Sequence, residues 1–455
     1  MKLNSEQWGH ILEAVGVFDQ IRIGRLRWAG RDLHVNNAQV KSLGQEFEFS
    51  FECSRDLWKK IEVGETLKKV KLEADSGNYF ISDLYIRRNA HPTFTCYSGN
   101  IHTEGYTKSV SFYYRLLIPL DRKITLRYIL NAEKADLAEE SIQFQLVSDE
   151  QANSFLLLQS ATKQAYREFA DKTFAVINAI AYLTGHFAGG YGYYLAYGSR
   201  SMLEITHINR REFRRSIYSL YTPVYSNPFG TIRDRRSSNR YYNRGLLRPM
   251  NESEFSKLVL KLLDVPNFTA ALLLIVESST ASLLYMPTGF AVALEILADI
   301  VKPKKRDSQA PIEKEIAKDI RLEMKDLIEG FTDRMTQEAH TIINKRIDNI
   351  NSPTNRTKLK APFVYLKINL TEDDELALES RNKLLHGMSF DIDKKDVKAL
   401  EEQGRVLHEI SMRLYTLLSM LILKWVGYEN YVVNQAKNQL EYNGTKIRED
   451  HYRKV

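Results

Sequence analysis

The spacing of apolar residues changes along this chain of 455 residues, and that change limits its architecture more than any other feature. Up to about residue 148, apolar residues alternate with polar ones, as Phe47, Phe49 and Phe51 do. A period of two is typical of half-buried β-strands. From about residue 251 the period is helical almost to the end. The sequence therefore predicts an α+β multidomain protein, with an N-terminal antiparallel β-rich domain followed by a C-terminal all-α helical bundle.

Three regions follow from these patterns. Residues 1–200 are expected to form the β-rich domain, a sandwich or barrel that ends in a helical segment over about 149–186. Within it, Asp75-Ser76-Gly77-Asn78 predicts a hairpin turn. Residues 201–250 are polar and rich in Arg and Tyr, which is typical of a connector. Residues 251–455 should form the helical domain, with one long charged, solvated helix over 312–351 and a peripheral polar tail after Glu429.

The composition is that of an ordinary soluble protein, with 44% hydrophobic and 27% charged residues. Cys53 and Cys96 are the only cysteines, which excludes a disulfide framework and a cysteine-based zinc site. The opening lacks the charged and apolar regions of a secretory signal, and acids interrupt the most apolar region, 268–301. We therefore expect a cytoplasmic protein without a membrane span, a bound metal or a cofactor.

The net charge of +7 arises in one place. Residues 210–248 contain ten arginines, no lysine and two acids, so this stretch carries +8 and the rest of the chain −1. Tyrosines lie between the arginines, and this combination can hold phosphates and stack bases. The predicted RNA-contacting residues are Arg210, Arg211, Arg214, Arg215, Arg233, Arg235, Arg236 and Arg240. The alternatives are a solvated linker and a surface that pairs with an acidic protein.

A helix predicted over 371–386 carries the most informative residues. Thr371 and Asp374 match a capping box at its start. One apolar stripe runs from Leu378 to Leu385. A second apolar face, on nearly the opposite side, consists of Leu376, Ala377 and Leu384. We therefore expect the helix to pack into its own domain by one face and against a second protein surface by the other.

Polar residues interrupt the first stripe of this helix. Arg381 and Asn382 stand where leucines are expected, and His386 lies one turn after Asn382. Because burying unpaired polar groups is costly, these side chains should face a polar cleft. Glu295, on an otherwise apolar helical segment, is a candidate to orient His386 or to pair with Arg381. The alternative for Glu295 is an acid satisfied within the core.

These residue types suit RNA cleavage without a metal. A guanidinium can hold two phosphate oxygens and balance the charge of the transition state. A histidine that titrates near neutrality can transfer protons, and the RNA 2′-hydroxyl serves as an internal nucleophile. One histidine cannot easily act as acid and base in the same step. Two copies of the chain around a dimer axis would supply both, so we expect a homodimer.

The segment RNKLLHG at 381–387, near the end of a helix in a C-terminal helical domain, resembles the HEPN superfamily. The resemblance implies a bundle that dimerises to form a composite, metal-independent ribonuclease site, with Arg381 and His386 catalytic and Asn382 supporting them. The β-rich region joined to such a bundle further resembles the ApeA-like abortive-infection proteins of bacterial antiphage defence. Because such an activity would be toxic if constant, we expect the N-terminal region to restrain it until a trigger such as a phage-derived protein binds.

The spacing of arginine and histidine is not specific by itself. Similar separations occur between Arg27 and His34 and between Arg334 and His340, but neither arginine is followed by an amide, and neither histidine by a glycine. Two alternatives to the nuclease stay open. One is a non-catalytic RNA-binding or regulatory protein that uses the arginine-rich stretch, and the other is an interaction protein whose helical domain only dimerises.

Overall fold

The computed structural model describes residues 3, 5–28, 31–43, 46–52, 54–59, 62–74, 76–90, 93–103, 110–120, 134–137, 141–149, 153–185, 187, 190–213, 228, 239–240, 243–246, 248–301, 310–385, 397–442, 444 and 446–455. The chain divides into two compact units. The first consists of Met1–Tyr218 and Pro249–Asp264, and the second of Ser219–Arg248 and Val265–Val455. The first is β-rich and the second helical, so the predicted α+β class is confirmed.

The first unit contains a sheet of 13 described strands with antiparallel neighbours. The strands are β1 (Arg22–Trp28), β2 (Arg31–Ser42), β3 (Phe47–Glu52), β4 (Thr66–Ala74), β5 (Gly77–Ala90), β6 (Thr93–Ser98), β7 (Ile101–Thr103), β8 (Tyr113–Pro119), β9 (Lys134–Leu137), β10 (Ile142–Ser148), β11 (Ser154–Ser160), β12 (Tyr191–Tyr197) and β13 (Ile205–Glu212). The helices are α1 (Ser5–Gly16), the 3-10 helix η1 (Val17–Gln20), α2 (Arg55–Trp58), α4 (Tyr166–Thr184) and α6 (Glu252–Asp264).

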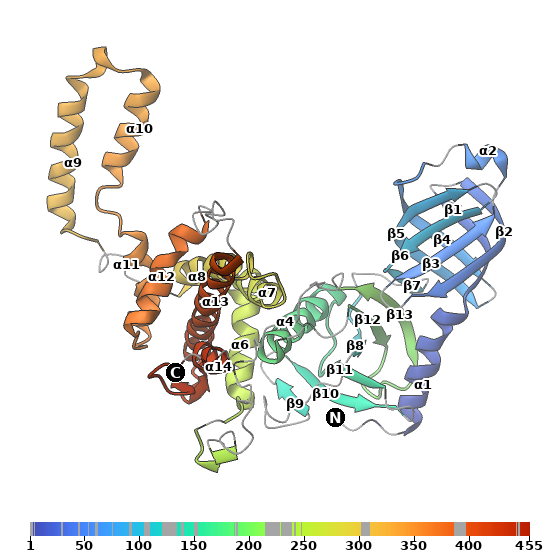
Figure 1. Cartoon of the computed structure of the whole chain (residues 1–455). Coiled ribbons are helices and arrows are strands. Elements are labelled where there is room, and N and C mark those ends of the chain that lie inside the picture. The colour runs from blue at the N-terminus through green and yellow to red at the C-terminus, as the bar shows by residue number, and fades with distance from the viewer. Residues whose placement is uncertain are drawn as a thin grey trace. The chain divides into compact units, whose positions relative to one another are not determined.

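Strands β1 to β6 close into a barrel (Figure 1). Their order is β4-β1-β2-β3-β6-β5, and β5 pairs back with β4. The alternation along β3 buries Phe47, Phe49 and Phe51, as its period of two predicts. Ala74 of β4 pairs with Gly77 of β5, so the predicted hairpin is confirmed. Gly77 has a φ of +131°, a conformation that favours glycine.

From the barrel, β7 continues the sheet to β13-β12-β8-β11-β10-β9. Helix α4 packs on this part, where the rings of Tyr114 and Phe169 stack with centroids 5.2 Å apart. The expectation of helix over 149–186 is wrong for β11. This strand buries Leu156, Leu157 and Leu158 in succession, and a strand covered on both faces has no alternation to distinguish it from a helix.

The boundaries between regions also differ from the prediction. Strand β13 lies inside the 201–250 stretch that was expected to be a connector, and β12 and β13 follow α4, so the helix α4 is not the last element of the β-rich part. Helix α6, expected in the helical domain, belongs to the first unit and packs on α4 and β9. Its apolar face predicts a helix but does not say which core covers that face.

The second unit is mainly helical. Its elements are α7 (Phe268–Ser278), α8 (Met286–Ile300), α9 (Lys314–Glu329), the 3-10 helix η3 (Thr332–Arg334), α10 (Gln337–Asp348), α11 (Asn355–Tyr365), α12 (Glu372–Leu385), α13 (Val397–Trp425), β14 (Tyr431–Val433), α14 (Gln435–Tyr442) and β15 (Tyr452–Lys454). Helix α13 packs on α8, α12 and α14. Its Glu401–Trp425 part is long and apolar enough to cross a membrane, but 78% of its most apolar window is buried, which is typical of a core helix.

A glycine fixes the position of α8 against α7. A Cβ atom at Gly289 would overlap the Ser278 hydroxyl, so a larger residue there would force the Ser278 side chain to move. On its other side, Phe290 packs on Tyr415 of α13, with ring centroids 5.7 Å apart. Helix α8, which carries Glu295, is therefore held between two helices of the core.

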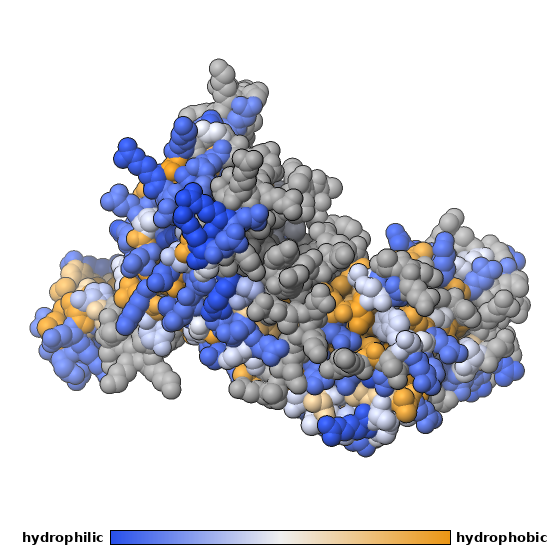
Figure 2. Space-filling model, turned by 90° about the horizontal axis from the view of Figure 1, so that it is seen from below, coloured by the Kyte–Doolittle hydropathy of each residue, from blue (hydrophilic) through white to orange (hydrophobic). Residues whose placement is uncertain are grey.

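The charged element predicted over 312–351 consists of two helices. Helices α9 and α10 run antiparallel and project as a hairpin from the rest of the helical unit (Figure 1). Lys325 on α9 pairs with Asp348 at the end of α10, at 2.6 Å. Figure 2 shows hydrophobic surface among hydrophilic residues at its left edge, where the hairpin lies. A single long helix was therefore the wrong expectation, because the turn at 330–336 reverses the chain.

The tail after Glu429 packs into the helical unit, so the expectation of a peripheral tail is wrong. Val432, Val433 and Tyr452 are buried on the pair of strands β14 and β15. The backbone N–H of Val433 donates to the carbonyl oxygen of Pro228 at 3.0 Å. The polar composition of the tail hid these apolar residues, which lie on strands of only three residues.

Candidate active site

Helix α12 begins as the sequence predicts. The backbone N–H of Thr371 donates to Oδ2 of Asp374 at 2.9 Å, and the N–H of Asp374 donates to Oγ1 of Thr371 at 3.2 Å. These reciprocal bonds form the predicted capping box, with Asp in place of Glu. The helix is described as far as Leu385. His386 and the predicted stop at Gly387 lie outside the described residues, as does the side chain of Asn382.

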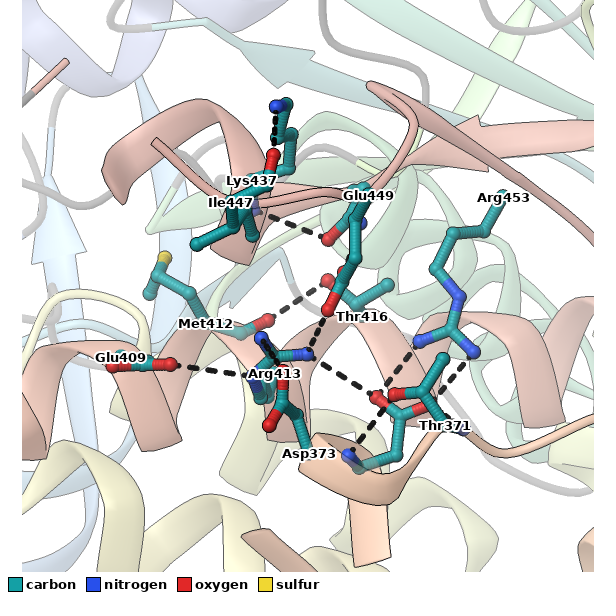
Figure 3. Close-up of polar contacts among 12 residues, drawn as sticks. Thr371, Asp373, Glu409, Met412, Arg413, Thr416, Lys437, Ile447, Glu449 and Arg453 are labelled. Atoms are coloured by element: carbon teal, nitrogen blue, oxygen red, sulfur yellow. Dashed lines mark hydrogen bonds and ion pairs between the residues drawn. The ribbon is translucent and has the colours of Figure 1, made fainter. Parts of the chain in front are cut away.

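A buried arginine holds the first turn of α12 (Figure 3). Arg413 of α13 is 3% exposed, and its guanidinium lies 3.1 Å from Asp373 and 2.7 Å from Glu449. Asp374 is fully buried and receives two bonds from Arg453, at 2.7 and 2.8 Å. Burial lowers the pKa of Arg413, but the acids beside it, Glu449 first, raise that pKa above its ordinary value. The charged network therefore ties α12 to α13 and to the C-terminal segment.

Sequence reasoning missed this network because its members are far apart in the chain. The available signal was Arg413 itself, a charged residue within the apolar run from Met412 to Leu423. A buried arginine requires acidic partners, but neither its position nor its type indicates which acids supply them.

Arg381 lies on the side of α12 that contacts α8. Its guanidinium pairs with the carboxylate of Glu295, and the two side chains are 16% and 33% exposed. Leu378 and Leu384, on either side of Arg381 in the sequence, are buried and fix the helix in place. The pairing of Glu295 with Arg381 is one of the two arrangements that the sequence left open. The other, a contact of Glu295 with His386, falls outside the described residues.

The Glu295 carboxylate affects what Arg381 can do chemically. It holds the guanidinium in one orientation, and partial burial strengthens their attraction relative to a pair in water. It also balances part of the positive charge, so Arg381 should attract a phosphate less strongly than an unpaired arginine would. This arrangement favours accurate placement of the guanidinium over tight binding of the ground state.

The second apolar face of α12 is mostly covered by its own unit. Ala377 and Leu384, expected to contact a second protein, are each 3% exposed. That expectation is wrong for these two residues, because α8, α11 and α13 all pack around α12. Among the described side chains of this face, Leu376 alone is exposed, at 61%.

Ion pairs add to the contact between α11 and α12. Lys360 lies 2.6 Å from Glu375, and Arg356 lies 3.1 Å from Glu375 and 2.8 Å from Glu379. The hydrogen bond from Lys360, followed by that from Arg356, lowers the pKa of Glu375. These pairs hold the outer side of α12 against α11, on the surface of the unit.

Arg210 does not contribute to an RNA-binding surface. Its side chain is fully buried, with the guanidinium carbon 4.2 Å from the ring centre of Phe47 and 4.3 Å from that of Tyr191. Its Nη1 donates to the carbonyl oxygen of Gly99 at 2.8 Å. The predicted RNA contact is therefore wrong for Arg210, because this residue of β13 packs between Phe47 of β3 and Tyr191 of β12 in the core.

The other predicted RNA-contacting arginines have different outcomes. Arg211 and Arg240 are exposed, and Nη1 of Arg211 lies 3.5 Å from the Tyr166 hydroxyl. The remaining predicted residues, Arg214, Arg215, Arg233, Arg235 and Arg236, lie outside the described residues. RNA contact by this stretch stays a prediction.

The two other arginine and histidine pairs of similar spacing do not share a helix. Arg334 lies in η3, and His340 lies in α10, 3.3 Å from Glu329. Arg27 lies in β1 and pairs with Glu73. The prediction that Arg27 and His34 lie in strand-like sequence is therefore confirmed.

Among the described residues, no group of three or more His, Cys, Asp and Glu side chains is placed to hold a metal ion. The chain matches no protein-family model, no curated protein and no solved structure. The functional interpretation of α12 therefore depends on its own residues and their geometry.

Proposed function

We propose that this chain is a metal-independent endoribonuclease of a bacterial antiphage, abortive-infection type, whose site is formed by Arg381, Asn382 and His386 from two copies of the chain. The observation that carries the proposal is the placement of Arg381. A carboxylate of the core helix α8 orients its half-buried guanidinium, and the first turn of the helix that carries Arg381 is locked by a buried ion network. Arg381 precedes His386 by five residues in the sequence. A guanidinium fixed in this way suits the stabilisation of charge that develops in a transition state.

The proposed reaction is an internal displacement. The RNA 2′-oxygen attacks the adjacent phosphorus while the bond from phosphorus to the 5′-oxygen breaks. One His386 accepts the 2′-hydroxyl proton, and the His386 of the second copy protonates the departing 5′-oxygen. Arg381 balances the extra negative charge on the phosphate, and Asn382 orients that phosphate. The products carry a 2′,3′-cyclic phosphate and a 5′-hydroxyl.

Regulation is part of the proposal. A nuclease of this kind would be toxic to its own cell if it were always active. The β-rich unit has its own closed barrel and core, and we assign it the role of restraining the helical unit until a phage-derived protein binds. Exposed arginines of the connector, such as Arg240, would guide the RNA to the site.

The test uses purified full-length protein and total RNA in EDTA, with the new ends mapped. Replacing His386 or Arg381 with alanine should slow cleavage by about a hundredfold or more. His340→Ala is the matched control, because His340 also follows an arginine at similar spacing in the helical unit. Its variant should cleave at the wild-type rate.

Two results would contradict the proposal. The first is cleavage that persists in His386→Ala, and the second is RNA that carries 5′-phosphate ends. If wild-type protein binds RNA but leaves it intact, and expression during phage infection is equally tolerated for wild-type and His386→Ala, the alternative of a non-catalytic RNA-binding protein is correct.

A further inference from the structure

The α9–α10 hairpin exposes large apolar side chains out of proportion to its length. In the described part of the chain, 19 large hydrophobic side chains are exposed, and seven of them lie between residues 312 and 351. Four of the seven form what we call the hairpin seam: Ile316, Met324, Leu327 and Phe331, which are 50%, 38%, 64% and 41% exposed. Concentrated apolar surface of this kind marks an interaction site on a protein.

The spacing within α9 indicates what kind of surface would cover the seam. Ala317, Ile320, Met324 and Leu327 follow one another at intervals of three, four and three residues, and Phe331 lies just past the end of the helix. That spacing is typical of a helix that packs lengthwise against other helices. Helix α10 covers only part of the row, since Ala317 is buried while Met324 and Leu327 remain exposed. A bundle of four helices would bury both sides of such a row.

We propose that the hairpin seam binds the hairpin of a second copy of this chain, in an antiparallel arrangement around a twofold axis. In such a contact the same surface serves both partners, so an apolar row on one hairpin meets the same row on the other. The four helices, α9 and α10 from each copy, then form a bundle with the seam residues inside.

The charges of the hairpin fit this occupant and this orientation. The half near the turn, residues 322–344, has five acidic and two basic residues, a net charge of −3 with His340 neutral. The half near the body, residues 312–321 and 345–351, has five basic and four acidic residues, a net charge of +1. Antiparallel pairing places each acidic half beside the basic half of its partner, whereas parallel pairing would place two acidic halves together.

This contact goes beyond the proposed nuclease activity and does not depend on it. It holds two copies together through a part of the helical unit that lies apart from α12. A composite site would use the association, but the association requires no RNA and no catalytic residue.

Sedimentation equilibrium of the full chain over a range of concentrations tests the contact. Wild-type protein should form a dimer, and Leu327→Glu should raise the dimer dissociation constant by about tenfold or more, because a seam side chain becomes charged. Leu322→Glu is the matched control. Leu322 is 54% exposed on the same helix but lies roughly 140° around it from Leu327, so this variant should dimerise as the wild type does.

Both leucines are exposed in the single chain, so neither variant should lose its fold, and circular dichroism checks this. The proposal is overturned if wild-type protein is monomeric, as it would be if another part of the same chain covers the seam. It is also overturned if Leu327→Glu dimerises normally, or if both variants weaken the dimer equally. Arg381→Ala should remain dimeric, so a failure of the nuclease proposal is distinguishable from a failure of this one.

Discussion

Replacing Arg413 with methionine should destabilise the helical unit by about 3 kcal/mol, at the lower end of the cost of breaking a buried ion pair. Methionine has a similar length but no charge, so the change removes the ion network and leaves the packing of the stem largely intact. The guanidinium is 3% exposed and lies within 4.0 Å of Asp373, Asp374 and Glu449. Its loss leaves the carboxylates of Asp374 and Glu449, which are 0% and 16% exposed, without one of their partners.

The magnitude follows from what remains after the substitution. The Asp374 side chain is fully buried, with 0% of its surface accessible, but it keeps its two bonds from Arg453. Glu449 keeps the bond from Nδ2 of Asn434 at 2.7 Å. These remaining partners offset part of the loss, which is why we expect a value near the lower end of the range and not near 5 kcal/mol.

Hydrogen exchange measured by mass spectrometry over a urea series is the appropriate assay, because it separates peptides of the helical unit from those of the β-rich unit. Peptides from 372–385 and 397–425 should lose protection at lower urea in the variant. Arg405→Met is the matched control on the same helix. Arg405 pairs with Glu402, but their side chains are 64% and 60% exposed, so its loss should cost less than about 0.5 kcal/mol.

The reasoning fails if Arg413→Met costs less than about 1 kcal/mol, or if the two variants cost the same. Either result would mean that burial of the network contributes nothing beyond an ordinary surface pair. Exchange that changes only in the C-terminal segment would show that Arg413 holds the tail but not the first turn of α12.

Three further predictions concern single buried groups. Arg210→Lys should lower the stability of the β-rich unit by about 2 kcal/mol, measured by thermal denaturation, because lysine cannot stack between two rings as a planar guanidinium does. Gly289→Ala should cost about 1–3 kcal/mol in urea unfolding, because the added methyl overlaps Ser278. Burial raises the pKa of Cys96 to about 12. An unfolded thiol has a pKa of about 8.5, so the contribution of Cys96 to the free energy of unfolding is complete below that pH and falls above it. Because the buried thiol stays protonated, Cys96 in folded Cys53→Ser protein should resist alkylation at about pH 8.

Local sequence patterns correctly predicted the elements whose burial or hydrogen bonds depend on residues close together in the chain. Phe47, Phe49 and Phe51 alternate because one face of β3 lines a core, and the same period is visible in the sequence. Thr371 and Asp374 cap a helix through atoms three residues apart, so their types and spacing were sufficient. Neither case required knowledge of a distant partner.

The errors arose where a distant partner decides the outcome. Three consecutive leucines of β11 suit a helix and a doubly covered strand equally, and the neighbouring strands β8 and β10 decide between them. Arg210 belongs by composition to the arginine-rich stretch, but Phe47 and Tyr191 come from other strands and make it a core residue. Arg413 likewise depends on acids at 373, 374 and 449.

The sequence predicted the Arg381–Glu295 pair as one of two arrangements of Glu295. Substitutions in this pair distinguish the nuclease proposal from a purely structural ion pair. A structural ion pair should show similar damage whichever partner is removed, since each change leaves the other group half-buried and alone. The nuclease requires the charge of Arg381 but needs Glu295 only to place it. Glu295→Gln should therefore lower kcat by about tenfold without raising KM, because the guanidinium is less well placed but binds phosphate more freely. Arg381→Gln should abolish cleavage, and equal effects of the two changes on kcat and KM would show that the pair is structural.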